Sequence, residues 1–290
     1  MTKPARIAAR PPARASAGFS SRLSTRLAVL ALAALAPLAA HAHRQWLLPS
    51  ATVLSEKDAW VTVDAAVSND LFYFEHVPMR LDNLAVTAPD GKTAVSAENA
   101  STGKYRSTFD LHLTQPGTYR VAVVNQGVFA SWKENGQTKR WRGAADTFAK
   151  NVPAGAQDLQ VNEIAGRIET YVTNGRPTRQ VLNTTGKGLE LAPITHPNDL
   201  IAGETASFRL LLDGKPAASQ KVSVVPGGIR YRDRLNEIEA TTDADGKFSV
   251  KYPAPGMYWM EAETRDDKTS IKEAKARRAT YAVTVEVLPQ

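Results

Sequence analysis

The feature that most constrains this chain is an alternation of apolar and polar side chains with a period of two residues. It recurs in short segments at residues 59–67, 84–87, 108–113, 119–124, 189–192, 205–212, 221–225, 247–252, 257–262 and 280–287. Side chains two residues apart in a β-strand lie on the same face of the sheet, so each segment predicts a half-buried strand. Many short strands of this kind are typical of antiparallel β-sandwiches.

Turn residues separate these segments. Glycine, proline and asparagine, which suit tight turns, lie at residues 89–92, 115–118, 135–136, 174–175, 213–216, 243–246 and 253–256. We therefore predict an all-β fold with two tandem immunoglobulin-like β-sandwich domains, at residues 43–187 and 188–290. The first would contain an irregular insertion, because the alternation is weak over residues 127–187. Within it we expect a helix at 144–150 and a strand at 161–172.

The first 42 residues have the composition of an export signal. They hold six basic residues and no acidic one, and residues 27–36 form an apolar run followed by small residues. A basic region, an apolar stretch and an Ala-x-Ala site predict a cleaved signal peptide at residues 1–42, and hence a periplasmic protein. Without this segment the formal charge falls from +7 to +1, with 30 basic against 29 acidic residues. The basic balance therefore gives no reason to expect a nucleic-acid partner.

The predicted cleavage would expose a histidine. The sequence Ala40-His41-Ala42 permits a cut after Ala42, which makes His43 the first residue, or a cut after Ala40, which leaves His43 third. The amine and the imidazole of one N-terminal histidine can chelate a single ion. A histidine in the third position behind a free amine suits square-planar Cu(II) or Ni(II). The alternative is that a histidine beside a cleavage site is a coincidence of sequence.

Several motifs together resemble the DUF4198 family. They lie at residues 43–49, 188–197, 213–216, 242–246 and 255–258. That family consists of secreted bacterial β proteins, some of them labelled as periplasmic components of nickel or cobalt uptake systems. The C-terminal half also resembles carboxypeptidase-regulatory, Ig-like domains, which usually bind or space and do not catalyse. The resemblance implies a periplasmic protein concerned with a transition metal, and not an enzyme.

Histidines are the candidate metal ligands, because the chain contains no cysteine. We expect His43, with its freed amine, to bind a divalent ion (Ni, Co or Cu) together with His76. Glu75 and His112 are further candidates. His76 and Glu75 lie in an aromatic loop at residues 72–78, where the family often carries an acidic residue before a proline. The alternation places His112 on the polar face of its strand, where a solvated histidine is also expected.

Two other readings stay open. Exposed aromatic residues such as Trp132 and Trp141, with the basic run at 139–142, would suit an interaction module that docks a membrane transporter component or an outer-membrane receptor. An N-terminal histidine with a second histidine also resembles the copper histidine brace of secreted oxidases. Metal binding and oxygen-dependent turnover distinguish the three readings.

Overall fold

The alternating segments fold into three β-sheets. The computed structural model describes residues 43–290, and the predicted signal peptide lies outside them. The N-terminal sheet has the strand order β1-β3-β8-β7. The short strand β4 also pairs with β3, along the edge opposite to β1. Its strands are β1 Arg44–Pro49, β3 Ala59–Ser68, β4 Val77–Pro78, β7 Glu98–Thr102 and β8 Ser107–Leu113.

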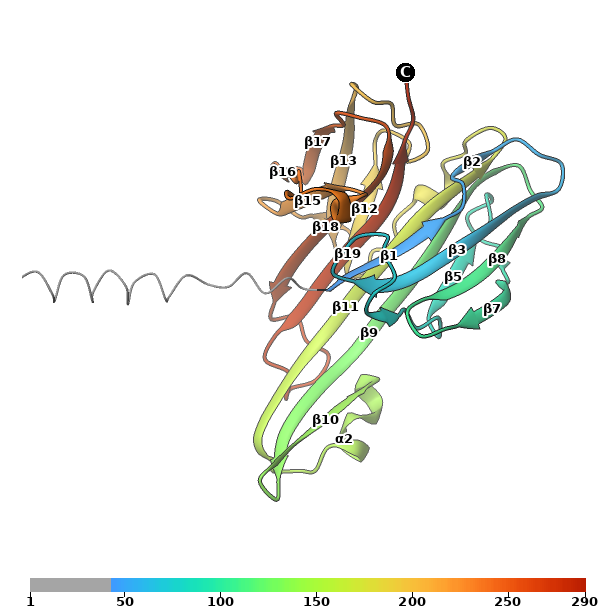
Figure 1. Cartoon of the computed structure of the whole chain (residues 1–290). Helices are drawn as coiled ribbons and strands as arrows, with labels where there is room; N and C mark the ends of the chain where they lie inside the picture. Colours follow the sequence, from blue (N-terminus) through green and yellow to red (C-terminus); the bar gives the residue numbers. More distant parts are fainter. Residues whose placement is uncertain (1–42) are drawn as a thin grey trace, which may run out of the picture. The chain divides into compact units, whose positions relative to one another are not determined.

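The largest sheet draws its strands from both halves of the chain, and we call it the shared sheet (Figure 1). Its order is β16-β15-β18-β19-β11-β9-β5-β6, with β10 beside β9 and β2 beside β11. Its strands are β2 Val53–Leu54, β5 Leu84–Thr87, β6 Ala94–Val95, β9 Gly117–Glu134, β10 Gln137–Gly143, β11 Gln157–Asn174, β15 Lys221–Pro226, β16 Ile238–Thr241, β18 Gly256–Asp266 and β19 Arg277–Val287.

The C-terminal sheet is small, and short helical turns complete the fold. β13 pairs with β12, β14 and β17. The bounds are β12 Leu189–Pro193, β13 Thr205–Leu212, β14 Lys215–Pro216 and β17 Lys247–Lys251, with helical turns η1 Ala145–Thr147, α2 Phe148–Asn151, η2 Gln180–Leu182 and η3 Ile229–Tyr231. None of the helices within residues 43–290 is long and apolar enough to cross a membrane.

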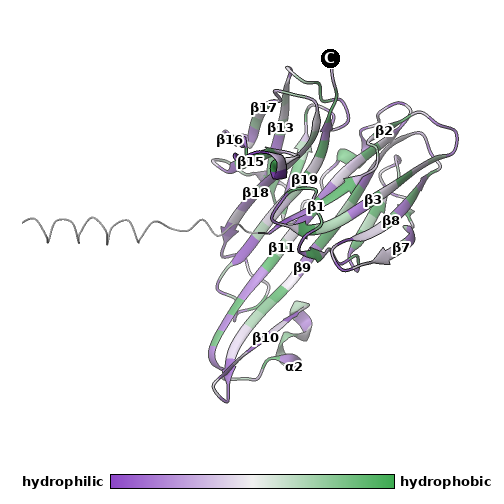
Figure 2. Cartoon of the chain, viewed as in Figure 1, coloured by the Kyte–Doolittle hydropathy of each residue, from purple (hydrophilic) through white to green (hydrophobic). Residues whose placement is uncertain are grey.

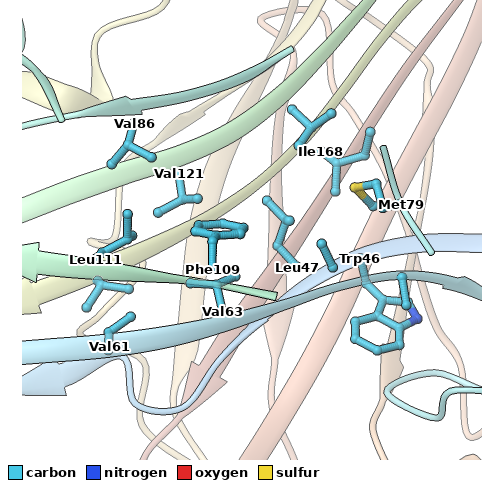
Figure 3. Packing of buried hydrophobic residues seen from close by; sticks show 14 of the residues in the cluster. Trp46, Leu47, Val61, Val63, Met79, Val86, Phe109, Leu111, Val121 and Ile168 are labelled. Carbon is cyan, nitrogen blue, oxygen red and sulfur yellow. The ribbon is translucent and has the colours of Figure 1, made fainter. Parts of the chain in front are cut away.

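The two smaller sheets pack on opposite faces of the shared sheet. Along β18, Trp259 belongs to the core under the N-terminal sheet, whereas Tyr258 and Met260 belong to the core under the C-terminal sheet. Neighbouring side chains in a strand point to opposite faces, so β18 is buried on both faces of the shared sheet. Figure 3 shows the first core, in which Phe109 of β8 and Val121 of β9 lie together.

The junction between the halves is the pairing of β11 with β19. These strands run parallel, with Glu163–Thr170 opposite Arg277–Thr284. A parallel pair needs a long connection between its strands. Here that connection contains strands β12 to β18, and residues 43–290 form one compact unit with two main cores.

Beyond the two main cores, β9 and β11 run on and are joined by β10 in a three-stranded arm. Figure 1 shows the arm ending at β10 and α2, and in Figure 2 its tip is mostly hydrophilic. A small separate core holds it, with Trp132, Phe148 and Val161 buried and Trp141 packed against them. The irregular insertion is thus a strand extension closed by a short helix.

The predicted all-β fold with sandwich sheets is confirmed. Segments 84–87 and 205–212 match β5 and β13 residue for residue. The expected helix at 144–150 is found as η1 and α2, and the expected strand at 161–172 lies within β11. The strand expected at 119–124 is wrong in length, because β9 continues to Glu134 along the arm.

Candidate functional site

The structure brings His43 and His76 into contact. Their imidazole rings are stacked, with centroids 3.8 Å apart and planes 3° from parallel. His43 directly precedes β1 and His76 directly precedes β4, and these strands flank the same end of β3. Gln45 and Val77 pair with the same residue of β3, Val67, from opposite sides. Two segments more than thirty residues apart therefore meet at this end of the sheet.

Trp46 holds the loop that carries His76. Its ring packs against Phe72 and Phe74, each with centroids 5.5 Å away, and its indole N–H donates to Ser68 Oγ over 2.8 Å. Ser68 Oγ in turn donates to the carbonyl of Asp70 over 2.6 Å. Because Trp46 is completely buried, these contacts fix the loop against β1.

The two rings could share a metal ion only after one of them turns. An imidazole binds a metal along a nitrogen lone pair, which lies in the plane of the ring. Since the His43 and His76 rings lie in parallel planes, an ion in the plane of one is outside the plane of the other. Both side chains are exposed, so turning one ring would not disturb a buried core. Within residues 43–290, no group of three or more His, Asp or Glu side chains has the geometry of a metal site.

Glu75 lies beside this pair but already has a structural role. Its Oε1 accepts hydrogen bonds from the main-chain N–H groups of Asn69 and Asp70, at 2.7 and 2.9 Å. These bonds close the loop between β3 and β4. Metal binding by this oxygen would compete with them.

His112 does not join the pair. Its Nε2 lies 2.7 Å from Asp58 Oδ1, and its ring stacks on Trp60 with centroids 4.3 Å apart. Trp60 lies eight residues along β3 from Ser68, the partner of Arg44. At about 3.3 Å per residue this separates His112 from His43 by roughly 25 Å. As expected, His112 lies on the polar face of β8, between the buried Leu111 and Leu113.

The fifth histidine, His196, is buried and fully engaged. Its Nδ1 accepts the N–H of Asn198 over 3.1 Å, and its Nε2 lies 3.0 Å from the carbonyl of Thr178. Burial is the largest effect on its pKa, which it lowers, so this imidazole is held neutral. His196 therefore packs the fold and is no surface ligand.

The expectation of exposed tryptophans on the insertion is wrong. Trp132 is only 9% exposed, and Trp141 packs against Phe148 with ring centroids 5.8 Å apart. Both belong to the core of the arm, because an extension of only three strands outside the sandwich needs its own apolar cluster. The neighbouring basic residues Lys139 and Arg140 are exposed.

One buried polar network was not expected from the sequence. Arg167 Nη1 donates to Glu169 Oε1 over 3.0 Å, and Tyr171 and Tyr281 each donate a hydroxyl hydrogen to Glu169 Oε2 over 2.9 and 2.8 Å. Burial, with the Glu169 carboxylate second, raises the pKa of both tyrosines well above the ordinary value, so both stay protonated donors. The network ties β11 to β19, at the junction of the two halves.

Comparison with solved structures finds distant likenesses. The D0–D1 domain of intimin is 14% identical with a TM-score of 0.21, covering 83% of this chain and 97% of that one. The ligand-binding domain of human OSCAR is 13% identical with a TM-score of 0.19, covering 85% of this chain and 100% of that one. At these scores the likeness carries no argument about this chain.

Comparison with functionally curated proteins finds no match. Comparison with protein families finds a match. Residues 40–266 match the family described as "Domain of unknown function (DUF4198)", and the chain therefore belongs to this family.

Proposed function

We propose that this protein is a periplasmic, non-catalytic binding protein that captures a divalent transition metal ion, Ni, Co or Cu, for uptake. The observation that carries the proposal is the contact between His43 and His76, two potential ligands from separate segments. The ion is the cargo of the protein, to be handed to a membrane transporter component or an outer-membrane receptor.

Cleavage after Ala42 would complete the ligand set. It would add the α-amine of His43 to the two imidazoles, giving three nitrogen ligands. Nitrogen ligands of this kind suit Ni(II) and Cu(II). Because a protonated imidazole or amine has no lone pair to give, affinity is expected to fall on acidification, as capture and release require.

Calorimetric titration of residues 43–290, with His43 as the true first residue, tests the proposal. Saturable one-to-one binding of Ni²⁺, Co²⁺ or Cu²⁺ is expected. His76→Ala should weaken it by at least tenfold, about 1.4 kcal/mol. A four-residue extension without histidine before His43, which removes the free amine from that residue without placing His43 third in the chain, should weaken it as well.

His112→Ala is the matched control. It removes an imidazole from the same sheet, at about 25 Å from the pair by strand rise, and should leave binding unchanged. Equal affinity in the His76→Ala variant would contradict the proposed ligands. Oxygen-dependent turnover by the copper-loaded protein with a reductant would favour the oxidase reading instead.

A further inference from the structure

A second site is indicated where a loop of the first half meets two loops of the second. A cleft of about 550 Å³ lies between the segment containing Phe72, the segment 226–236 that follows β15, and the segment 253–258 that leads into β18. Its size is within the usual range of small-molecule sites.

The walls of this cleft are mostly apolar. Aliphatic, aromatic and proline side chains supply them, from Leu48, Phe72, Pro226, Pro253, Pro255 and Met257. The hydroxyl of Tyr258, which also lines the cleft, already donates to the carbonyl of Ala254 over 2.9 Å. An apolar group would therefore be accommodated without leaving that hydroxyl unpaired.

Arg232 provides the only charged side chain of the cleft lining. Its guanidinium donates to four main-chain carbonyls, those of Pro226, Gly227, Arg234 and Leu235, at 2.5 to 2.9 Å. Within residues 43–290 no carboxylate lies at ion-pair distance from it. These carbonyl oxygens accept from four of the five guanidinium N–H groups, which leaves one N–H on Nη1, and they do not neutralise the charge. A full positive charge at an apolar wall favours an anion beside it.

The backbone at the mouth of the cleft is held in an unusual conformation. Phe72 has a φ of +62°, in the left-handed region that bulky residues rarely adopt. A Cβ at Gly227 would lie 3.0 Å from the Phe72 ring, so any larger residue there would have to displace the ring. Phe72 of the first half and Gly227 of the second half therefore lie close together where both line the cleft.

We propose that this cleft binds a carboxylate carried on an apolar or aromatic group, with Arg232 facing the carboxylate and Phe72, Met257 and the prolines packing on the apolar part. This chemistry is shared by a free organic acid and by the C-terminus of a peptide that ends in an apolar residue. The site uses none of the proposed metal ligands and does not depend on metal binding, although Phe72 lies in the loop that carries His76.

The test is a set of NMR titrations of residues 43–290 with phenylacetate and with phenylacetamide, its neutral analogue. Saturable shifts are expected at the amides of Gly227, Gly228 and Gly256. Phenylacetamide should bind at least tenfold more weakly, because the charge is the principal polar recognition element. Equal binding of the two compounds, or shifts centred elsewhere, would overturn the proposal.

Variants separate the charge from the shape of the cleft. Arg232→Gln should abolish the preference for the acid, whereas Arg234→Gln, on the same loop but not in the cleft lining, should keep it. Ala254→Trp adds a large side chain at an exposed position of the lining and should abolish binding of both compounds. It keeps the proposal testable if Arg232→Gln does not fold, and unchanged binding in Ala254→Trp would refute it.

A peptide arm identifies the source of the carboxylate. N-acetyl-Ala-Ala-Phe is titrated as the free acid and as the amide. Tighter binding of the free peptide than of phenylacetate supports a peptide C-terminus, and the reverse supports a small organic acid. If neither the free peptide nor phenylacetate reaches saturation, the proposal is overturned.

Discussion

Removing the Glu169 carboxylate should destabilise the whole protein. Glu169 is 2% exposed and accepts hydrogen bonds from Arg167, Tyr171 and Tyr281. In Glu169→Leu the two tyrosine hydroxyls lose their acceptor, and Arg167 keeps only Glu190 as an ionic partner, at 3.4 Å. Breaking a buried pair by removing one partner costs about 3–5 kcal/mol.

A double-mutant cycle shows whether the cost comes from the pair itself. Arg167→Met alone should also destabilise, because it leaves the Glu169 carboxylate without its cation. The double variant should cost less than the sum of the two single changes, by up to about 3 kcal/mol. Glu190 is expected to tolerate the loss of Arg167, because the main-chain N–H groups of Thr185, Gly186 and Lys187 donate to it.

Urea unfolding followed by circular dichroism measures these differences. Arg80→Gln is the control, since the pair it breaks with Asp82 is exposed on both sides and should change stability by no more than about 0.5 kcal/mol. A single-variant cost below about 1 kcal/mol at Glu169, or strict additivity in the cycle, would refute the view that this network locks β11 to β19.

Three further predictions concern other parts of the fold. Burial lowers the pKa of His196 in the folded protein. Below about pH 6.5 the unfolded chain therefore takes up a proton that the folded chain does not. The free energy of unfolding should be highest above that pH and should fall on acidification. Melting temperatures between about pH 7.5 and 5 should show this slope, and an identical slope in His196→Gln would contradict it. Gly246→Ala should lower the free energy of unfolding by more than about 1 kcal/mol, because φ is +74° and the added Cβ would lie 2.4 Å from the carbonyl oxygen of Leu210. A melting temperature equal to that of the unaltered protein would contradict this, since it would show that the turn relaxes. Trp132→Ala should destabilise the core of the arm, so amide hydrogen exchange should become faster in β10 while β13 stays protected. An equal increase of exchange in both strands would show that the arm is not a separate unit.

The strands were predictable because their signal is local. Residues 84–87 and 205–212 alternate, except at Ala85 and Leu211, and lie between turn residues, so both the type and the bounds of β5 and β13 followed from the pattern. Along the arm, β10 is mostly exposed on both faces and carries no such alternation. Its strand structure comes from pairing with β9, which no local pattern reports.

The shared sheet was not predictable from the same pattern. The alternation shows which side chains are buried but not what they are buried against. β19 carries apolar residues on both faces because the two smaller sheets cover opposite sides, and its parallel pairing with β11 joins segments over a hundred residues apart. Two separate sandwiches and one shared sheet give the same sequence signal in each strand.

The two candidate sites also differ in how far they could be predicted from the sequence. His43 and His76 could be nominated from residue type and from the predicted cleavage, but their contact depends on β1 and β4 flanking one end of β3. The Arg232 cleft left no sequence signal, because the partners of this guanidinium are main-chain carbonyls. Any residue type can supply a carbonyl, so only the folded backbone reveals the uncompensated charge.

We propose that His43 and His76 bind one metal ion together. The most direct measurement is the anomalous diffraction map of residues 43–290 crystallised with Ni²⁺ or Cu²⁺, with His43 as the first residue. We expect a single peak about 2 Å from a nitrogen of each imidazole, with one ring turned out of the stacked arrangement. A peak coordinated by only one of these histidines, or located at His112, would contradict the claim.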